Sequence, residues 1–254
     1  MSEPDLIRLS QGHLNLLSIC PPKFQQVYID CLGSLPVPEQ QKSMEWGSRF
    51  HLLMQQRELA LPIEPLLATE TELDSSLKAL IQAAPELSPD ANVWREAEHC
   101  RTFSIDNFLF TVIYDLLIAS GDRATILDWK TYRQPIGIKK LKHNWQTRLY
   151  LYVLAETSEY EPEQLNMTYW FVKTGKPKSV TITYTQQQHQ QIKQELTMLL
   201  DNLKTWLQNN RELQINFPHR ANCSEKTCPF YRDFAEADFQ KMFESIDEIE
   251  EVSI

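Results

Sequence analysis

An aspartate and a lysine stand two positions apart in an apolar, β-prone segment of the sequence, "TILDWK". A strand points residues i and i+2 to the same face, so Asp128 and Lys130 are expected to project together, away from Leu127 and Trp129. Charged groups inside an apolar sheet are costly unless they are paired or bound to a metal ion. A salt bridge at the end of a strand would also satisfy this pair, so the pair alone leaves both interpretations open.

A second aspartate strengthens the metal interpretation. Asp115 lies in "NFLFTVIYDLLIA", which is apolar on both alternating faces, as in a central strand. A turn separates it from Asp128, so an antiparallel hairpin would bring the two carboxylates together, and they would repel unless a divalent cation joined them. Oxygen ligands suit Mg²⁺ or Mn²⁺, and Lys130 suits a phosphate oxygen that gains negative charge. Together the three residues predict metal-assisted phosphodiester hydrolysis.

The elements that must position these residues follow from periodicity and turn signals. Helices are expected after Ser10, after the prolines of "CPPKF", at 41–59 and twice within 63–84. Strands are expected at 93–105, 107–119, 124–130, 166–175 and 178–184, with helices at 138–158 and 186–210. This order predicts an α/β sandwich with a mixed sheet.

Composition excludes several classes of protein. The 254 residues correspond to one large domain or two small ones. No apolar run is long enough for a transmembrane helix, and no secretory signal is visible, so we expect a cytoplasmic protein without a membrane partner. The five cysteines are odd in number and unevenly spaced, which is typical of a reducing compartment rather than of a disulfide scaffold.

The net charge of −9 is unevenly distributed along the chain. Residues 130–148 contain no acid but six bases: Lys130, Arg133, Lys139, Lys140, Lys142 and Arg148. Such a surface suits phosphate contacts that weaken with salt. Residues 233–254 carry eight acids against one base, which is typical of a solvated tail or, as a sharper hypothesis, of a shield for the basic surface.

Five motifs in order resemble the RecB-like branch of the PD-(D/E)XK nuclease superfamily, including its stand-alone cyanobacterial members. They are "CPPKF" near the N-terminus, "WGSRFH", the aspartate followed by "DWK", "QTRLY" and the C-terminal "CSEKTCPF". The resemblance implies a restriction-endonuclease-like α/β sandwich, in which a central mixed β-sheet is flanked by helices. We expect one domain at 1–232, with a helical part at about 1–90 and a catalytic sheet core at about 91–184, followed by the acidic tail at 233–254.

The resemblance also implies roles for individual residues. Asp115, Asp128 and His51 would hold Mg²⁺ or Mn²⁺, Lys130 would be catalytic, and Gln146 and Tyr150 would border the site. Ordinary helix packing explains Tyr150 equally well. The acidic residue that the family carries on the preceding strand would be Glu96 or Glu98, with Glu96 preferred. The sequence departs from the family at Val112, where a glycine is usual.

Many relatives bind an iron–sulfur cluster through four cysteines, but this chain offers three in the matching segments: Cys20, Cys223 and Cys228. A [4Fe–4S] cluster ordinarily requires four thiolates. Three interpretations therefore stay open: no metal, a cluster that Cys31 completes in an unusual geometry, or zinc bound with the help of His219.

The leading functional prediction is a metal-dependent deoxyribonuclease, an exonuclease acting on single strands or DNA ends in repair or recombination. The sequence contains no helicase P-loop, so a helicase or another repair protein would supply any unwinding. The alternatives are a catalytically inactive DNA-binding or scaffolding protein with the same fold, and a structural protein whose charges form salt bridges.

Overall fold

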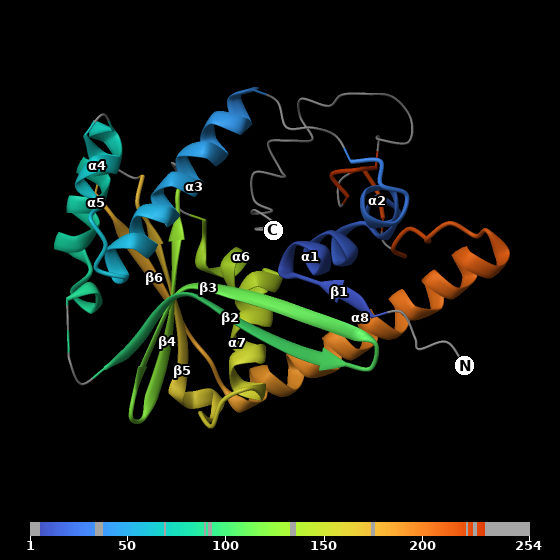
Figure 1. The fold of residues 1–254 in the computed structure, drawn as a ribbon. Coiled ribbons are helices and arrows are strands. Elements are labelled where there is room, and N and C mark those ends of the chain that lie inside the picture. Colours follow the sequence, from blue (N-terminus) through green and yellow to red (C-terminus); the bar gives the residue numbers. More distant parts are fainter. Residues whose placement is uncertain are drawn as a thin grey trace. The chain divides into compact units, whose positions relative to one another are not determined.

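A computed structural model describes residues 6–33, 38–68, 70–88, 90, 93–132, 136–173, 176–221, 223–225 and 228–231 (Figure 1). The chain divides into two compact units. The sheet unit comprises residues 36–103 and 111–189, and the termini unit comprises residues 1–35, 104–110 and 190–254. The predicted domain bounds of 1–232 stay a prediction, and the acidic tail lies outside the described residues.

The sheet unit is built on a mixed sheet whose long hairpin carries the residues of interest. Its strands are β4 (Arg123–Lys130), β5 (Leu165–Phe171), β6 (Lys178–Thr183) and most of β2 (Trp94–Ile105) and β3 (Phe108–Ser120). β2 pairs with β3, β3 with β4 and β5 with β6, while β4 and β5 run parallel. Because β4 runs parallel to β5, a helical crossover joins the two strands, as such pairs require.

Helices lie on both sides of strands β4 and β5 (Figure 1). One group consists of α3 (Pro38–Glu58), α4 (Glu64–Leu67), α5 (Thr71–Ala83) and a short 3₁₀ turn (Pro85–Leu87). Its apolar residues pack with Leu127 and Trp129 of β4 into one buried core. The alternate residues of β4, Asp128 and Lys130, therefore face away from this core, toward the crossover helices.

The crossover after β4 contains two helices, not the single helix predicted at 138–158. They are α6 (Ile138–His143) and α7 (Trp145–Glu156), followed by a 3₁₀ turn (Pro162–Gln164). The helix is interrupted at Asn144. The side chain of Asn144 accepts a hydrogen bond from the backbone N–H of Gln146 and so caps α7. An asparagine competes well for this N-terminal position, which is why the helix restarts here.

The termini unit joins both ends of the described chain. It contains β1 (Ile7–Leu9), α1 (Gln11–Ile19), α2 (Pro21–Phe24), a π-helical turn (Gln25–Ile29) and most of α8 (Gln186–Leu213). Ser10 caps α1 and the prolines open α2, as predicted. β1, which was not predicted, pairs in parallel with Phe108–Phe110 at the start of β3.

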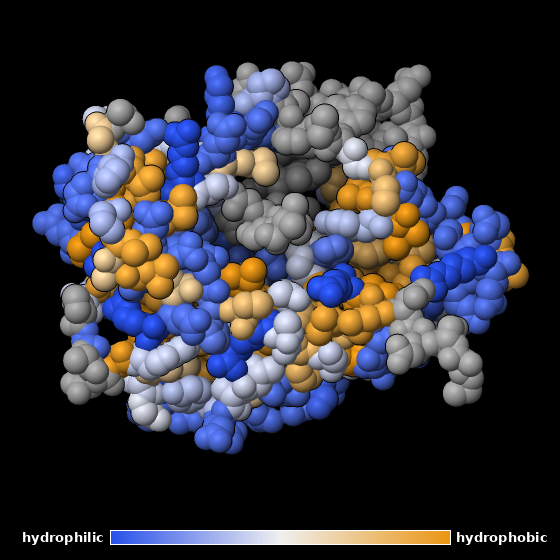
Figure 2. Space-filling model, viewed as in Figure 1, coloured by the Kyte–Doolittle hydropathy of each residue, from blue (hydrophilic) through white to orange (hydrophobic). Residues whose placement is uncertain are grey.

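Apolar side chains also reach the surface. Figure 2 shows several on this face of the molecule. The exposed ones include Leu59 and Leu61, which lie between α3 and α4, and Leu66 of α4. Exposed residues of this kind are ordinary on folded proteins. None of the described helices is long and apolar enough to cross a bilayer.

Candidate active site

The β3–β4 hairpin brings the two aspartates together, as the sequence predicted. The last paired residues of the hairpin are Leu116 and Leu127, so Asp115 and Asp128 follow at the next position on each strand. Oδ2 of Asp115 lies 2.6 Å from the backbone N–H of Trp129, which donates to it. This bond ties the Asp115 carboxylate to the backbone of β4, directly beside Asp128.

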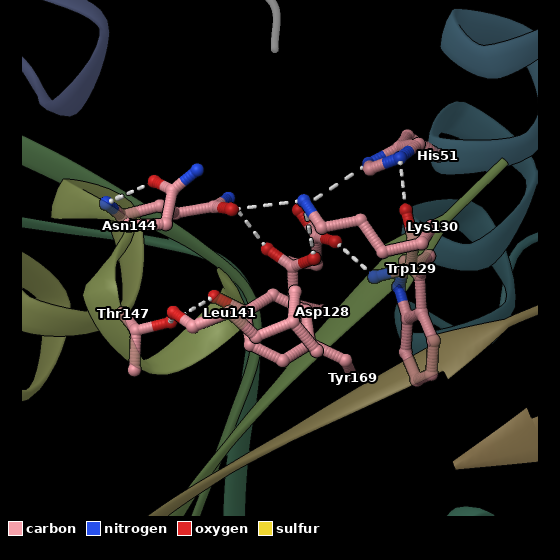
Figure 3. A network of polar contacts seen from close by, with 10 residues as sticks. His51, Asp128, Trp129, Lys130, Leu141, Asn144, Thr147 and Tyr169 are labelled. Carbon is pink, nitrogen blue, oxygen red and sulfur yellow. Dashed lines mark hydrogen bonds and ion pairs between the residues drawn. The ribbon is translucent and has the colours of Figure 1, made fainter. Parts of the chain in front are cut away.

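Asp128, Lys130 and Gln146 form a closed buried network (Figure 3). Nζ of Lys130 lies 2.9 Å from Oδ1 of Asp128 and donates to Oε1 of Gln146, also at 2.9 Å. Nε2 of Gln146 donates to Oδ2 of Asp128 at 2.8 Å. Oδ1 of Asp128 thus has an ion pair but no well-angled hydrogen bond. The Gln146 amide fixes the carboxylate and the ammonium in one arrangement.

His51 of α3 approaches the same point from the other side of β4. Its Nε2 lies 3.0 Å from the carbonyl oxygen of Trp129, and its Nδ1 lies 3.3 Å from Oδ1 of Asp115. A carbonyl only accepts, so it holds the ring proton on Nε2, and in the neutral ring the lone pair of Nδ1 then faces the carboxylate. With the ring in this neutral form, a cation between the two groups makes the contact favourable, whereas a protonated ring would donate to Asp115 directly.

Glu98 completes a group that fits a divalent metal ion. Ligand atoms of His51, Glu98 and Asp115 lie within 4.8 Å of one another, and all three residues are half-buried. One imidazole and two carboxylates form a donor set suited to Mg²⁺ or Mn²⁺ with further oxygen ligands. The residues present therefore fit the metal that the sequence predicted, with Glu98 in the group in addition to His51 and Asp115.

The geometry favours Glu98 over Glu96, the residue preferred from sequence. Glu96 is exposed and its carboxylate lies 2.8 Å from Nδ1 of His99. Glu98 has a left-handed backbone, with φ of 53°, which breaks the regular alternation of β2 at this residue. The carboxylate of Glu98, unlike that of Glu96, belongs to the group with His51 and Asp115.

Burial shifts the proton affinities of the acidic groups here. Burial raises the pKa of Asp128 to about 6, the neighbouring Asp115 adds to this rise, and Lys130 and His51 oppose it. Burial, together with Asp128 and Asp115, raises the pKa of Tyr150 well above its usual value. Tyr150 therefore stays protonated at neutral pH, buried and hydrogen-bonded to Gln146.

A second layer of residues supports the network from β5 and α7. Nζ of Lys130 lies 5.2 Å from the ring centre of Tyr169. The hydroxyl oxygens of Tyr169 and Thr147 are 2.7 Å apart, and Thr147 donates to the carbonyl of Leu141 at 2.6 Å. These hydrogen bonds link α6, α7 and β5 next to Lys130.

The predicted DNA-binding residues are distributed over α6 and α7. Lys139, Lys140 and Lys142 are exposed on α6. Arg148 lies with its guanidinium 3.9 Å from the ring centre of the buried Trp145. Arg133 lies outside the described residues. The structure thus places three of the predicted bases on one short exposed helix close in sequence to the network.

The cysteines predicted as cluster ligands lie in the termini unit. Cys20 and Cys228 are buried, Cys223 is half-buried, and none of the five cysteines forms a disulfide. Cys31, the fourth thiol considered for a cluster, is exposed. Three thiolates do not make the four-thiolate site of a [4Fe–4S] cluster, so the residues do not fit that group.

Comparison with known proteins identifies the family. A model of the PD-(D/E)XK nuclease superfamily matches residues 8–232. The chain belongs to the PD-(D/E)XK nuclease superfamily. A search of curated proteins gives no match. Among solved structures, a protein from Eubacterium rectale described as a "putative exonuclease" has a TM-score of 0.53 at 10% identity, over 91% of this chain and 89% of its own.

A second solved structure, SSO0001, has a TM-score of 0.33 at 12% identity and covers 78% of each chain. The Eubacterium rectale match, at 10% identity, is evidence for the fold alone. It agrees with the mixed α/β architecture predicted for a restriction-endonuclease-like protein. The matching family model is that of a nuclease superfamily.

Sequence reasoning missed the supporting groups of this site. The backbone of Trp129 holds both Asp115 and His51, and a backbone contact leaves no mark in the residue types. Thr147 and Tyr169 read as ordinary helix and strand residues. Asn144 carried a signal, since asparagine before an apolar helical segment is a known cap.

Proposed function

We propose that this protein is a cytoplasmic, divalent-metal-dependent deoxyribonuclease of the RecB-like branch, acting on single-stranded DNA or DNA ends in repair or recombination. The observation that carries the proposal is the metal-binding group of His51, Glu98 and Asp115 beside the buried Asp128–Lys130 pair. The exonuclease description of the neighbour from Eubacterium rectale favours attack at ends.

His51, Glu98 and Asp115 would hold Mg²⁺ or Mn²⁺, with Asp128 as the adjacent acid. When bound, such an ion polarises a phosphoryl oxygen and lowers the pKa of a coordinated water molecule. The carbonyl of Trp129 keeps the proton of His51 on Nε2, so Nδ1 is the atom that faces the ion.

Lys130 would stabilise the negative charge that builds on the phosphate during hydrolysis. Its ammonium group has a fixed position, because Asp128 and Gln146 hold it and the Tyr169 ring lies beside it. An ammonium that is already in place needs no reorganisation during the reaction. Gln146 is therefore a positioning residue for both Lys130 and Asp128.

The lysines of α6 would contact the DNA backbone. Lys139, Lys140 and Lys142 are exposed, and this part of the sequence lacks acids. Lysine–phosphate contacts release counterions and give binding without sequence preference. A nuclease that acts on any strand end needs this kind of binding.

The test is cleavage of DNA labelled at the 5′ or 3′ end, single- or double-stranded, with Mg²⁺, Mn²⁺ or EDTA. Lys130→Met keeps the length of the side chain and removes its charge, and Lys78→Met is the matched control on the exposed face of α5. We expect metal-dependent cleavage that is lost in Lys130→Met and kept in Lys78→Met. A closed circular substrate separates attack at ends from internal cleavage.

Absence of cleavage with either metal by the folded protein would contradict the proposal. DNA binding without cleavage would then favour the inactive, DNA-binding alternative. Cleavage of RNA but not DNA would keep the chemistry and change the substrate.

A further inference from the structure

Three thiols and an imidazole from the two ends of the described chain meet in the termini unit. Cys20 stands at the start of α2, and His219, Cys223 and Cys228 follow α8. Sγ of Cys223 lies 3.5 Å from Nδ1 of His219. The thiol of Cys228 interacts with the thiols of both Cys20 and Cys223. Groups about two hundred positions apart in sequence thus lie in the same part of the unit.

Packing around the thiols fixes the two segments against each other. The rings of Phe24 and Phe217 are stacked with centres 6.3 Å apart, and Nζ of Lys23 lies 5.8 Å from the ring centre of Phe230. Oε1 of Gln25 accepts a hydrogen bond of 2.7 Å from the backbone N–H of Phe217. Cys20 and Cys228 belong to the same two segments and are buried, with only 1% and 4% of their surfaces exposed.

The segment after α8 lacks regular secondary structure wherever it is described. Between Gln214 and Tyr231 its described residues form turns and extended stretches but no helix or strand. Such a segment has few backbone hydrogen bonds of its own and depends on other links for its order. A metal ion held by groups from both segments supplies such a link.

The donor set selects the metal. Four thiolates are the usual requirement of a [4Fe–4S] cluster, and this place offers three with an imidazole. Three cysteines and one histidine are a standard ligand set for structural zinc. His219 and Cys223 are separated by three residues and Cys223 and Cys228 by four, within the range for zinc ligands on one segment.

We propose that Cys20, His219, Cys223 and Cys228 bind one structural Zn²⁺ ion that joins the N-terminal helices to the segment after α8. No three of these four ligand atoms lie within 4.8 Å of one another, unlike those of His51, Glu98 and Asp115, so zinc binding requires the side chains to move closer together.

The first experiment measures metal content in the full-length protein, purified without chelator and freed of any affinity tag. We expect one zinc per chain, no iron or acid-labile sulfide, and release of the zinc by a thiol-specific mercurial. An Asp115→Asn variant separates this ion from zinc held by carboxylates of the active site, and it should keep one zinc per chain. Zinc far below one per chain, or iron with sulfide in its place, would overturn the proposal.

The second experiment uses variants that leave the buried thiols intact. His219 is exposed, so His219→Ala should fold, lose zinc affinity at least about 100-fold in chelator competition and lose its stabilisation by zinc. Cys31→Ser is the matched control, an exposed cysteine of the same unit outside the ligand set, and it should bind zinc as the wild type does. Unchanged affinity in His219→Ala would remove the imidazole from the site. DNA cleavage is not a readout here, so this proposal and the nuclease proposal can fail separately.

Discussion

When the His51 ring is neutral, the lone pair of its Nδ1 faces the carboxylate of Asp115. The Trp129 carbonyl holds the proton of the neutral imidazole on Nε2, which leaves Nδ1 opposite the carboxylate at 3.3 Å. Asp128 adds a second acid whose charge Lys130 offsets. The site therefore holds more negative charge than its own cations neutralise, and a divalent ion relieves the imbalance.

Asp115→Asn tests this imbalance through stability as well as activity. The asparagine oxygen still accepts from the N–H of Trp129, and its amide N–H donates to Nδ1 of His51. We expect cleavage to fall by roughly 100-fold or more, while the melting temperature of the metal-free protein stays equal or rises. Differential scanning calorimetry in EDTA measures the second effect, and a clearly lower melting temperature would contradict the charge argument.

Two glutamate variants test the choice on β2. Glu98→Gln should weaken Mg²⁺ binding by about 10-fold or more, because it replaces one of the two carboxylate ligands by a neutral amide. Glu96→Gln is the matched control, since Glu96 pairs with His99 outside this group. Isothermal titration with Mn²⁺ measures both affinities. The reverse order of effects would restore Glu96 as the acidic residue of the site.

The raised pKa of Asp128 predicts how the stability of the metal-free protein depends on pH. The folded state binds this proton more tightly than the unfolded state, whose pKa is near 3.8. The resulting stability is present below that value and is lost as pH rises through about 6. The unfolding free energy of the wild type minus that of Asp128→Asn should fall between pH 4 and 7, by on the order of 3 kcal/mol.

Urea unfolding in EDTA measures this difference at each pH. Mg²⁺ should flatten the dependence, because a nearby cation favours the ionised carboxylate at neutral pH. A difference that is constant with pH would show that Asp128 keeps an ordinary pKa.

The sequence identified the residues whose types are unusual for their surroundings. Asp115, Asp128 and Lys130 are charged residues within apolar strands, so the sequence pattern alone predicted that their side chains lie together in one site. Glu96 and Glu98 look equivalent, because a regular strand puts both on one face. The left-handed backbone at Glu98 distinguishes the two residues, and this conformation cannot be predicted from the residue type.

At the scale of elements, the break between α6 and α7 sets the position of Gln146. Asn144 accepts from the N–H of Gln146 at 2.8 Å, which places Gln146 in the first turn of α7. Asn144→Ala should cost about 1 kcal/mol in stability and lower kcat with little change in KM. Denaturant unfolding and steady-state cleavage measure these effects. Asn144→Asp keeps the cap and should restore both values, and failure to restore them would place the role of Asn144 elsewhere.

Elements were predictable where their pattern was long. Strands β2 to β6 and helices α3, α5 and α8 arose near their expected positions, because each repeats its apolar period several times. β1 has three residues and forms only because β3 offers an open partner. The break at Asn144 escaped because apolar periodicity continues on both sides of it.

The exposed lysines of α6 make a prediction about salt dependence. Replacing Lys139, Lys140 and Lys142 by glutamine should reduce the slope of log affinity against log salt by about 2, at about 0.7 for each phosphate contact on a single strand. Replacing the exposed Lys78, Lys193 and Lys204 in the same way is the control. Fluorescence anisotropy with a labelled oligonucleotide measures both slopes. Equal slopes would exclude α6 as the DNA contact.

At the scale of the whole molecule, charge is separated along the chain. Residues 233–254 carry eight acids and one base, whereas residues 130–148 carry only bases. If the tail competes with DNA for the basic residues, truncation after Arg232 should raise DNA affinity at low salt and matter less at high salt. Replacing the eight acids by their amides in the full chain is the matched control and should act in the same direction. Unchanged affinity in both variants would leave the tail as a solvated segment.

The arrangement of the termini unit also has a consequence for folding during translation. Phe24 and Gln25 can contact Phe217 only after most of the chain has been translated. At about 5–20 residues per second, this is a wait of roughly 10–40 s for the first helices. During that time the buried face of α1, with Leu14 and Leu17, has no completed unit to cover it. The N-terminal end of the nascent chain is therefore accessible to chaperones. A ribosome that stalls before residue 217 leaves this unit incompletely folded.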